Sequence, residues 1–254
     1  MKKWFNMKKI FVLLLSVFFV TTVSVAADTT NTVKQFMQQV QQAYRLANFL
    51  SFHVEYRYAN KDQPSNYIDT MSGEVAMNNK HLRFLLEDVE TVTNDRYTIQ
   101  VHRNEKLIYL STPQQSQVTD PVAALDSALR HYDGISAQVT RAGRVATLNI
   151  VFPPGQAYKH VTMAIDEHTG YLQNVVYEMY TEGLVEKDQL MDGGSGGPYQ
   201  SEGRIEIVFS QYRQGQFTES LFSDTSYFTR LGEGKYQPTE KYKDYQVFLA
   251  SPKL

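Results

Sequence analysis

Cysteine is absent from these 254 residues, so the chain can form no disulfide, no thiolate nucleophile and no cysteine-ligated metal site. An excess of positive charge is also absent: 25 Lys and Arg stand against 27 Asp and Glu, which gives a net charge of −2 at pH 7. Proteins that bind nucleic-acid phosphates need a basic stripe, so the charge balance argues against a nucleic-acid partner.

Long apolar runs are scarce, and the one exception lies near the N-terminus. The basic stretch "MKKWFNMKK" precedes the run "IFVLLLSVFFV", and "TTVSVAAD" then ends in small residues. This order is typical of a secretory signal peptide, which we expect to occupy residues 1–26 and to be cleaved after Ala26 or Ala27. The alternative is an uncleaved membrane anchor, but the run is short compared with the about 20 apolar residues that span a bilayer.

Removal of the signal peptide changes the expected surface of the protein. Residues 1–26 contain four lysines and no acidic residue, so the net charge falls from −2 to −6. A bacterial lipoprotein carries its lipid on a cysteine, and this chain has none. We therefore expect a mature protein that lies beyond the inner membrane, in the periplasm or secreted, and is not a lipoprotein. We also expect it to be a monomer with a single domain over residues 27–254.

Aromatic residues are plentiful, with 17 Tyr and 14 Phe, which favours strands. Apolar residues at helical spacing predict one amphipathic helix over 31–50, and "TDPVAALDSALRHYDG" predicts a second over 119–134. Elsewhere apolar and polar residues alternate with period two. The expected strands are 51–58, 67–77, 81–87, 89–93, 97–102, 106–111, 135–141, 144–152, 159–166, 171–182, 204–214 and 245–251.

About ten or eleven of these segments, joined by short turns, would form a sheet, and with two helices they predict an α+β fold that is mainly antiparallel β. We expect one large curved sheet, an unclosed β-barrel, with the helices covering its concave face. Residues 183–203 are polar and glycine-rich, and they predict an exposed loop between two strands. Residues 223–254 form a tyrosine-rich C-terminal extension.

One short motif suggests an enzyme. Gly193–Gly197 reads GGSGG and matches the nucleophile pattern G-x-S-x-G, with Ser195 at its centre. A nucleophile elbow needs a buried strand before the serine and a helix after it, whereas here a polar loop precedes Ser195 and Pro198 follows. The six histidines show no metal-ligand spacing, and no glycine-rich nucleotide loop follows a strand. We expect no catalytic residue, no metal and no cofactor, and a hydrolase using Ser195 is the weakest alternative.

Apolar residues on the predicted strands point to a binding surface or to an ordinary core, and the pattern alone fits both. A large curved sheet with two short helices leaves space in its concavity unless the helices fill it. The register decides which residues face that space, since a shift by one residue turns every side chain to the other face.

Several short motifs follow one another in a distinctive order between residues 33 and 222. An amphipathic helix leads into "LSFHVEYRY" (50–58), and Gly73 opens "GEVAM". An aromatic strand and a Pro-x-x-x-Gln-Val segment follow in "NEKLIYLSTPQQSQV" (104–118). The remaining segments are "DPVAALDSAL" (120–129), "MAIDEHTGYLQNV" (163–175), "IEIVFSQYRQGQ" (205–216) and "SLF" (220–222). In this order the segments resemble the outer-membrane lipoprotein carrier (LolA/LolB-like) family.

This resemblance implies an unclosed barrel with an apolar cavity, no catalytic residues, and a periplasmic carrier of lipid or of lipidated protein. Each buried methylene of an acyl chain would contribute about 0.8 kcal/mol. Leu125 and Leu129 of the second helix would form the lid. The expected cavity residues are Phe52, Val54, Tyr56, Phe84, Leu86, Ile108 and Leu110.

The chain departs from the family pattern at three places. An arginine that holds the lid shut in family carriers falls at Asn79, beside Lys80. The loop 183–203 is longer than the usual turn, and the extension 223–254 is additional. These departures leave the fold prediction intact and weaken the inference of lipoprotein shuttling. The alternative function is an envelope interaction module that docks a protein partner through the tyrosine-rich extension and binds no ligand.

Overall fold

The computed structural model describes residues 27–78, 80–113, 134–182, 184–191, 196–216 and 218–251. The predicted features that fall outside these ranges are the signal peptide, the second helix over 119–134 with Leu125 and Leu129, the latch position Asn79, and Ser195. Among the described residues, no helix is long and apolar enough to cross a membrane.

The first predicted helix is α2, Ala27–Arg45. Its buried residues Val33, Phe36, Met37 and Val40 recur at helical spacing, so one stripe of the helix packs inward. The prediction extended the helix to residue 50 and was wrong at that end, because Leu50 already begins the first strand and is fully buried there.

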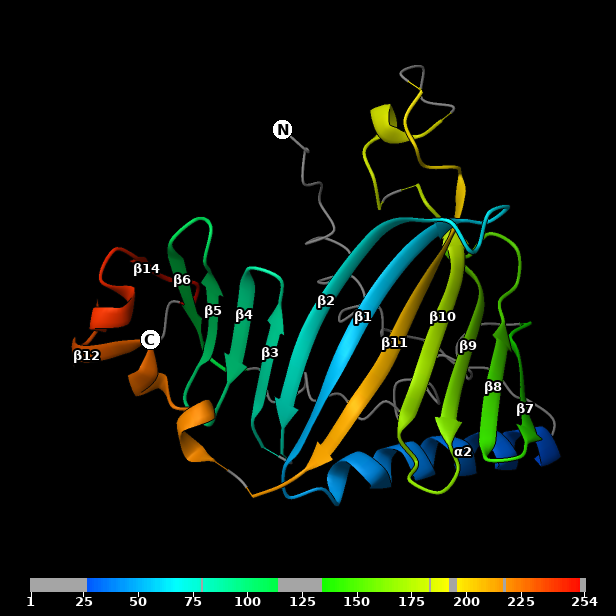
Figure 1. The fold of residues 1–254 in the computed structure, drawn as a ribbon, viewed down its shortest axis with the longest axis horizontal. Coiled ribbons are helices and arrows are strands. Elements are labelled where there is room, and N and C mark those ends of the chain that lie inside the picture. Colours follow the sequence, from blue (N-terminus) through cyan, green and yellow to red (C-terminus); the bar gives the residue numbers. More distant parts are fainter. Residues whose placement is uncertain are drawn as a thin grey trace. The chain divides into compact units, whose positions relative to one another are not determined.

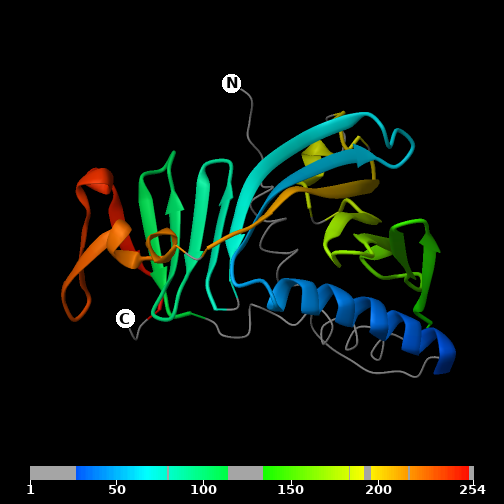
Figure 2. The same cartoon turned by 60° about the horizontal axis from the view of Figure 1, so that its bottom comes forward.

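Within the described residues, twelve strands form one hydrogen-bonded sheet in the order β14-β6-β5-β4-β3-β2-β1-β11-β10-β9-β8-β7 (Figure 1). Strands β2 to β6 and β7 to β11 pair antiparallel with their neighbours, whereas β14 joins β6 in parallel. The edges of this order are β14 and β7, so the sheet is unclosed, and the predicted mainly antiparallel fold is confirmed. The long strands β1, β2 and β11 curve along their length (Figure 2). The bounds are β1 Leu50–Asn60, β2 Tyr67–Met77, β3 Leu82–Leu86, β4 Val89–Thr93, β5 Thr98–His102, β6 Leu107–Ser111, β7 Ser136–Ala142, β8 Val145–Val151, β9 Tyr158–Asp166, β10 Leu172–Tyr180, β11 Glu202–Gln214 and β14 Gln246–Leu249.

The chain divides into two compact units, each built from separate segments. Unit 1 comprises Met1–Ala43, Glu55–Thr70 and Gln117–Val208. Unit 2 comprises Tyr44–Val54, Met71–Ser116 and Phe209–Leu254. Strands β1, β2 and β11 contribute residues to both units, while β7 to β10 belong to unit 1 and β3 to β6 with β14 belong to unit 2.

In unit 1, helix α2 packs closely against the turn between β9 and β10. Gly170 in this turn has φ +74°, and a Cβ at this position would lie 2.9 Å from the Ala43 Cβ and 3.0 Å from the Gln39 carbonyl oxygen. The Gln39 side chain also donates a hydrogen bond of 2.7 Å to the Glu167 carbonyl. Glycine is therefore required here both by the left-handed backbone and by the close approach of the helix.

The described parts of the segment between β10 and β11 fold back onto unit 1 rather than forming a simple exposed loop. Tyr199 is buried, and its ring meets that of Tyr58 edge-on at 5.2 Å. Asn60 donates to the Pro198 carbonyl at 2.9 Å and accepts from the Gln200 backbone N–H at 2.9 Å. The segment also contains the 3₁₀ helix η1, Lys187–Gln189.

In unit 2, the C-terminal tail (residues 223–251) folds over one face of β4, β5 and β6. It contains the 3₁₀ helix η3 (Asp224–Ser226), the hairpin of β12 (Phe228–Gly232) and β13 (Lys235–Pro238), the 3₁₀ helix η4 (Glu240–Tyr242) and β14; the 3₁₀ helix η2 (Glu219–Leu221) precedes it. A continuous hydrophobic core joins the tail to the sheet. Its buried members are Ala76, Val92, Tyr97, Ile99, Val101, Ile108, Leu110, Phe222, Tyr227, Phe228 and Tyr242.

The tail is fixed to the sheet by polar contacts as well. The Tyr227 hydroxyl donates to Glu90 at 2.9 Å, and the Asn94 amide donates to the Phe222 carbonyl at 2.9 Å. Arg96 donates to both carboxylate oxygens of Asp224, at 2.5 and 2.7 Å. Tyrosines of the extension are thus used within the chain, which weighs against the alternative that they dock a protein partner.

Candidate ligand-binding faces

Strand register assigns the predicted cavity residues of unit 2 to two opposite faces. Phe84 lies opposite Thr91 and Leu86 opposite Val89, whereas Leu85 lies opposite Glu74 and Glu90. His53 contacts Glu74 at 3.1 Å, so His53 is on the Leu85 side. Side chains alternate along a strand, so Phe52 and Val54 share the other side with Phe84 and Leu86. We call this side the inner face of unit 2.

Ile108 and Leu110 lie on the opposite side. Ile108 pairs with Val101 and Leu110 with Ile99, and all four belong to the core beneath the C-terminal tail. We call this side the tail face of unit 2. The prediction that Ile108 and Leu110 line one cavity with Phe84 and Leu86 is wrong about their direction, because the tail buries the face on which they lie.

The strands of unit 1 also have two faces of different character, one apolar and one polar. Strand pairing places buried Leu148, Val161 and Ile205 on one side, and His160, Thr162, Glu178 and Arg204 on the other. We call these the apolar face and the polar face of unit 1. Tyr58 lies on the apolar face, because a side chain at Gly203 would collide with its ring, and Gly203 pairs with Met179 of that face. Tyr56 is two residues before Tyr58 on the same strand and therefore shares the apolar face.

The middle of the apolar face is not fully buried. Tyr56, Met163 and Tyr177 are half-buried, although strand residues around them, such as Leu148 and Ile205, are less than 4% exposed. The rings of Tyr158 and Tyr177 lie 5.7 Å apart. These side chains form an apolar, aromatic surface that solvent still reaches, which is the property expected of a site for a hydrocarbon ligand.

The tyrosines of this face stay uncharged at physiological pH. Burial raises the pKa of Tyr56 to about 12 and that of Tyr158 to about 12. Burial also raises the pKa of Tyr177, helped by its neighbours Tyr158 and Tyr56. Phenol groups in this state offer apolar ring surface and a neutral hydroxyl, and they do not supply a nucleophile.

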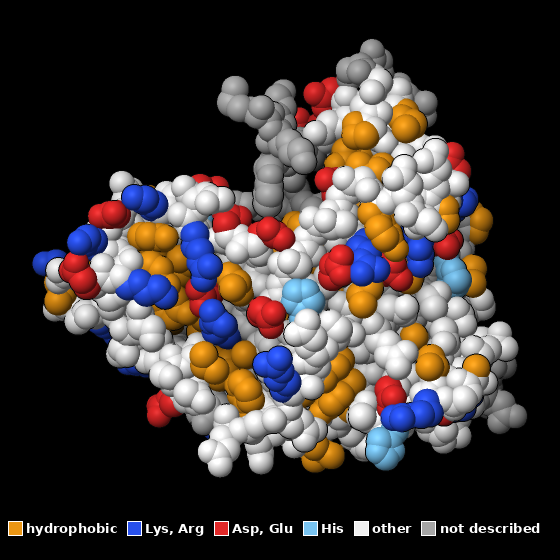
Figure 3. All heavy atoms as spheres, in the orientation of Figure 1, with side chains coloured by type: hydrophobic (Ala, Val, Ile, Leu, Met, Phe, Trp, Pro, Cys, Tyr) orange, Lys and Arg blue, Asp and Glu red, His pale blue; other side chains and the backbone are white. Residues whose placement is uncertain are grey.

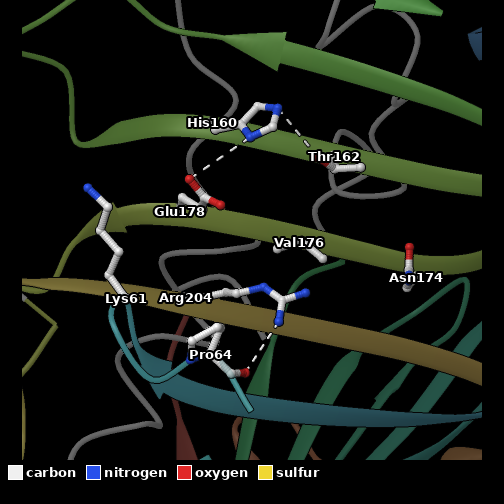
Figure 4. A pocket seen from close by; sticks show the side chains of 8 residues that line it. All are labelled: Lys61, Pro64, His160, Thr162, Asn174, Val176, Glu178 and Arg204. Carbon is white, nitrogen blue, oxygen red and sulfur yellow. Dashed lines mark hydrogen bonds and ion pairs between the residues drawn. The ribbon is translucent and has the colours of Figure 1, made fainter. Parts of the chain in front are cut away.

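A pocket of about 480 Å³ opens on the polar face of unit 1 (Figure 4). Figure 4 shows Arg204 beside Pro64, whose carbonyl accepts a hydrogen bond of 3.4 Å from it, and His160 beside Glu178 at 4.0 Å. Lys61 pairs with Glu202 at 2.5 Å. Because each cation already faces an acceptor, this pocket is a solvated surface and not a site for hydrocarbon. It is lined by Lys61, Pro64, His160, Thr162, Asn174, Val176, Glu178 and Arg204.

Acidic and basic side chains are interspersed on the face of the molecule turned to the viewer in Figure 3. Across the described residues, no group of three His, Asp or Glu side chains is placed to hold a metal ion. Of the carboxylates that the structure describes, Glu90 is the most deeply buried; it is 2% exposed and is held by Arg83 at 2.7 Å and Arg103 at 2.9 Å. Its contacts fix the tail, so its role is structural.

The sequence reasoning missed Met163, Tyr158 and Tyr177 as surface residues of the apolar face. The signal was present: "LQNVVYEMY" places Val175, Tyr177 and Met179 on one side of a strand by simple alternation. The predicted cavity residues all came from the early strands, and β9 and β10 received none.

No family model matches the sequence, and no curated protein matches it. Among solved structures, the chain is similar to an uncharacterized conserved protein from Thermus thermophilus, with 10% identity and a TM-score of 0.47 over 86% of this chain and 99% of that one. It is also similar to a LolA superfamily protein from Nitrosomonas europaea, with 12% identity and a TM-score of 0.33 over 78% of this chain and 99% of that one. A third is the lipoprotein LppX from Mycobacterium tuberculosis, with 14% identity and a TM-score of 0.33 over 75% of this chain and 99% of that one. Because these TM-scores are below 0.5, the ligands of those proteins are no argument about this chain.

Proposed function

We propose that this protein is a non-catalytic binder of acyl chains and acts as a carrier of lipid or lipidated protein in the periplasm. The observation that carries the proposal is the half-buried centre of the apolar face of unit 1, formed by Tyr56, Met163 and Tyr177. A hydrocarbon chain laid on this surface would gain about 0.8 kcal/mol for each methylene removed from water. The proposed lid, Leu125 and Leu129, and the cavity residues Phe52, Val54, Phe84 and Leu86 of unit 2 remain predictions.

The electrostatics of the apolar face agree with a neutral chain and not with a charged substrate. Burial raises the pKa values of Tyr56, Tyr158 and Tyr177 above the ordinary value of 10, which indicates surroundings that disfavour a charge. An unpaired charge placed among such side chains would be costly, since burial penalises the ionised form. The acyl part of an amphiphile satisfies this environment, and its polar end must lie elsewhere.

A pair of adjacent substitutions in β10 tests the proposal. Tyr177→Lys places an ammonium on the apolar face, and the matched control Val176→Lys places it on the polar face, one residue away. We expect Tyr177→Lys to weaken binding of a fluorescent C16 fatty acid by about tenfold or more, equivalent to about 1.4 kcal/mol. Val176→Lys should leave the affinity within about twofold.

A second readout keeps the test independent of folding. Circular dichroism should show that both variants keep the strand signal, and Tyr177→Leu should bind as well as the wild type because it keeps an apolar side chain. Absence of acyl binding by the folded wild-type protein would overturn the proposal. Unchanged binding in Tyr177→Lys would place the ligand elsewhere, and equal loss in both lysine variants would show that the effect is not specific to the apolar face.

A further inference from the structure

The inner face of unit 2 changes from apolar to polar along the sheet. Strand β3 presents Phe84, but the residues opposite it on β4 and β5 are Thr91 and Gln100. The neighbouring row runs from Leu82 to Thr93 and then Thr98. We call the half-buried side chains on this part of the face the polar strip. Its members are Thr91, Thr93, Thr98, Gln100, His102 and Ser111.

The polar strip contains hydroxyl, amide and imidazole groups but no Lys, Arg, Asp or Glu among the described side chains of β4, β5 and β6 on this face. The opposite side of the same strands is different, since Glu90 lies there between Arg83 and Arg103. Glu105 approaches the strip at its turn end, 3.6 Å from His102 Nδ1. The strip itself therefore offers rows of neutral hydrogen-bonding groups, and the Glu105 carboxylate lies at its turn end beside His102.

Aromatic rings border the strip at the sheet edge. Tyr109 lies opposite Gln100, and Phe248 of β14 lies opposite Tyr109, with their rings stacked at 5.6 Å. The His102 ring meets Tyr109 edge-on at 5.3 Å. Phe248 is 43% exposed, so much of its ring is open to solvent at the sheet edge. The C-terminal tail thus adds an aromatic rim to the inner face.

Hydrogen-bonding capacity within the strip is partly unused. Thr93 and Thr98 hydroxyls bond one another at 3.2 Å, and the Ser111 hydroxyl donates to the Thr98 carbonyl at 3.4 Å. Within the described part of the chain, the Thr91 hydroxyl and the Gln100 amide have no side-chain or backbone partner. An amide offers two donors and an acceptor with two lone pairs, so Gln100 can engage a ligand hydroxyl as both donor and acceptor.

We propose that the polar strip and its aromatic rim bind the uncharged, hydroxyl-rich headgroup of a glycosylated amphiphile. This inference rests on the proposed function, because it takes the ligand to be a lipid. A sugar ring presents C–H groups on its face, which suit the rings of Tyr109 and Phe248, and hydroxyls on its rim, which suit Gln100 and Thr91. An anionic or cationic headgroup finds no partner in the strip and would be desolvated without compensation.

Three amphiphiles with one C12 chain and different headgroups test the inference on the full-length mature protein. Dodecyl maltoside, dodecanoate and dodecyltrimethylammonium are titrated below their micelle concentrations by isothermal calorimetry. We expect the maltoside to bind at least tenfold more tightly than either charged amphiphile. Gln100→Ala with Tyr109→Ala should reduce this preference to within about twofold while the dodecanoate affinity stays unchanged.

Matched controls separate the possible results. Thr229→Ala, on the exposed part of the tail hairpin, should leave all three affinities unchanged. Thr91→Val, which keeps the shape and removes the hydroxyl, should weaken only maltoside binding. If no amphiphile binds, the proposed function fails. If all three bind with equal affinity, or a charged headgroup is preferred, the proposed function stands and the headgroup inference is overturned.

Discussion

The polar face of unit 1 and the tail face of unit 2 are made by the same kind of antiparallel strands but have opposite character. In unit 1 this face carries His160, Thr162 and Glu178 and remains in contact with solvent. The tail face of unit 2 carries Ile99 and Ile108, both 0% exposed, because the C-terminal tail lies over them. The alternation of residues along a strand therefore indicates that the strand has two different faces, but it does not indicate which face another layer covers.

The difference extends to the charges. Glu178 in unit 1 has a side chain 43% exposed and lies 4.0 Å from His160. Glu90 in unit 2 has a side chain 3% exposed and is engaged by Arg83, Arg103 and Tyr227. An exposed pair is screened by water and contributes little, whereas a buried carboxylate with three donors is costly to disturb. Three experiments on stability test whether the two faces differ in this way.

The largest effect is expected when the tail is removed. A stop codon after Gly215 deletes the tail along with Phe222 and exposes Ile99, Ile108 and Leu110 to water. Full burial of one such side chain contributes about 1.5–3 kcal/mol, so the loss of several is comparable to the total stability of a typical domain. We expect unit 2 to unfold, measured as loss of protection in amide hydrogen exchange over residues 82–111.

The control for the truncation is a substitution on the outside of the tail. Leu231 is 64% exposed, so Leu231→Ala should leave hydrogen exchange in unit 2 unchanged. Full protection of residues 82–111 in the truncated protein would mean that the tail covers the sheet without stabilising it. Burial of the tail face would then not contribute to the stability of unit 2.

A smaller effect is expected from Glu90→Gln, which leaves Arg83 and Arg103 without their carboxylate. Removal of one partner from a fully buried ion pair typically costs about 3 kcal/mol or more, and the loss here should be smaller because Arg83 is 24% and Arg103 40% exposed. Burial alone would raise the pKa of Glu90, but Arg83, Arg103 and Tyr227 together lower it below its ordinary value of 4.5. Urea unfolding at pH 7 should show the loss of stability directly.

The sign of the pH dependence follows from this shift. A carboxylate whose folded pKa is lowered stabilises the fold above its unfolded pKa, and this contribution disappears as the pH falls through the folded pKa. The difference in stability between wild type and Glu90→Gln should therefore be constant near neutral pH and shrink below about pH 4.5. A difference that grows on acidification would contradict the assigned network.

Strand positions were predictable because they depend on local alternation. Strand β4 was predicted at its observed bounds, and β8 was predicted over 144–152 against Val145–Val151. The tail hairpin was missed although Gly232, Glu233 and Gly234 carry a turn signal, and Gly234 adopts φ +64°. That error came from treating a tyrosine-rich segment as irregular and not from an absence of information.

The direction of Ile108 was not predictable from its own strand. Its cover comes from tail residues such as Tyr242 and Val247, which are more than 100 positions away in the sequence, and from the parallel pairing of β14 with β6. The family resemblance ends at residue 222, so nothing in the motifs indicated a second layer. Local patterns identify strands, whereas the covered face depends on non-local packing that the same pattern fits equally well.

The smallest effect is expected from Glu178→Gln on the polar face of unit 1. This carboxylate is 4.0 Å from His160, and both side chains are at least one third exposed. Exposed pairs contribute between about 0 and 1 kcal/mol, so the urea midpoint should move by less than about a third of the shift seen for Glu90→Gln. If Glu178→Gln instead destabilises the protein as much as Glu90→Gln does, the polar face is as tightly organised as the tail face. Solvent contact would then not be what distinguishes the two units.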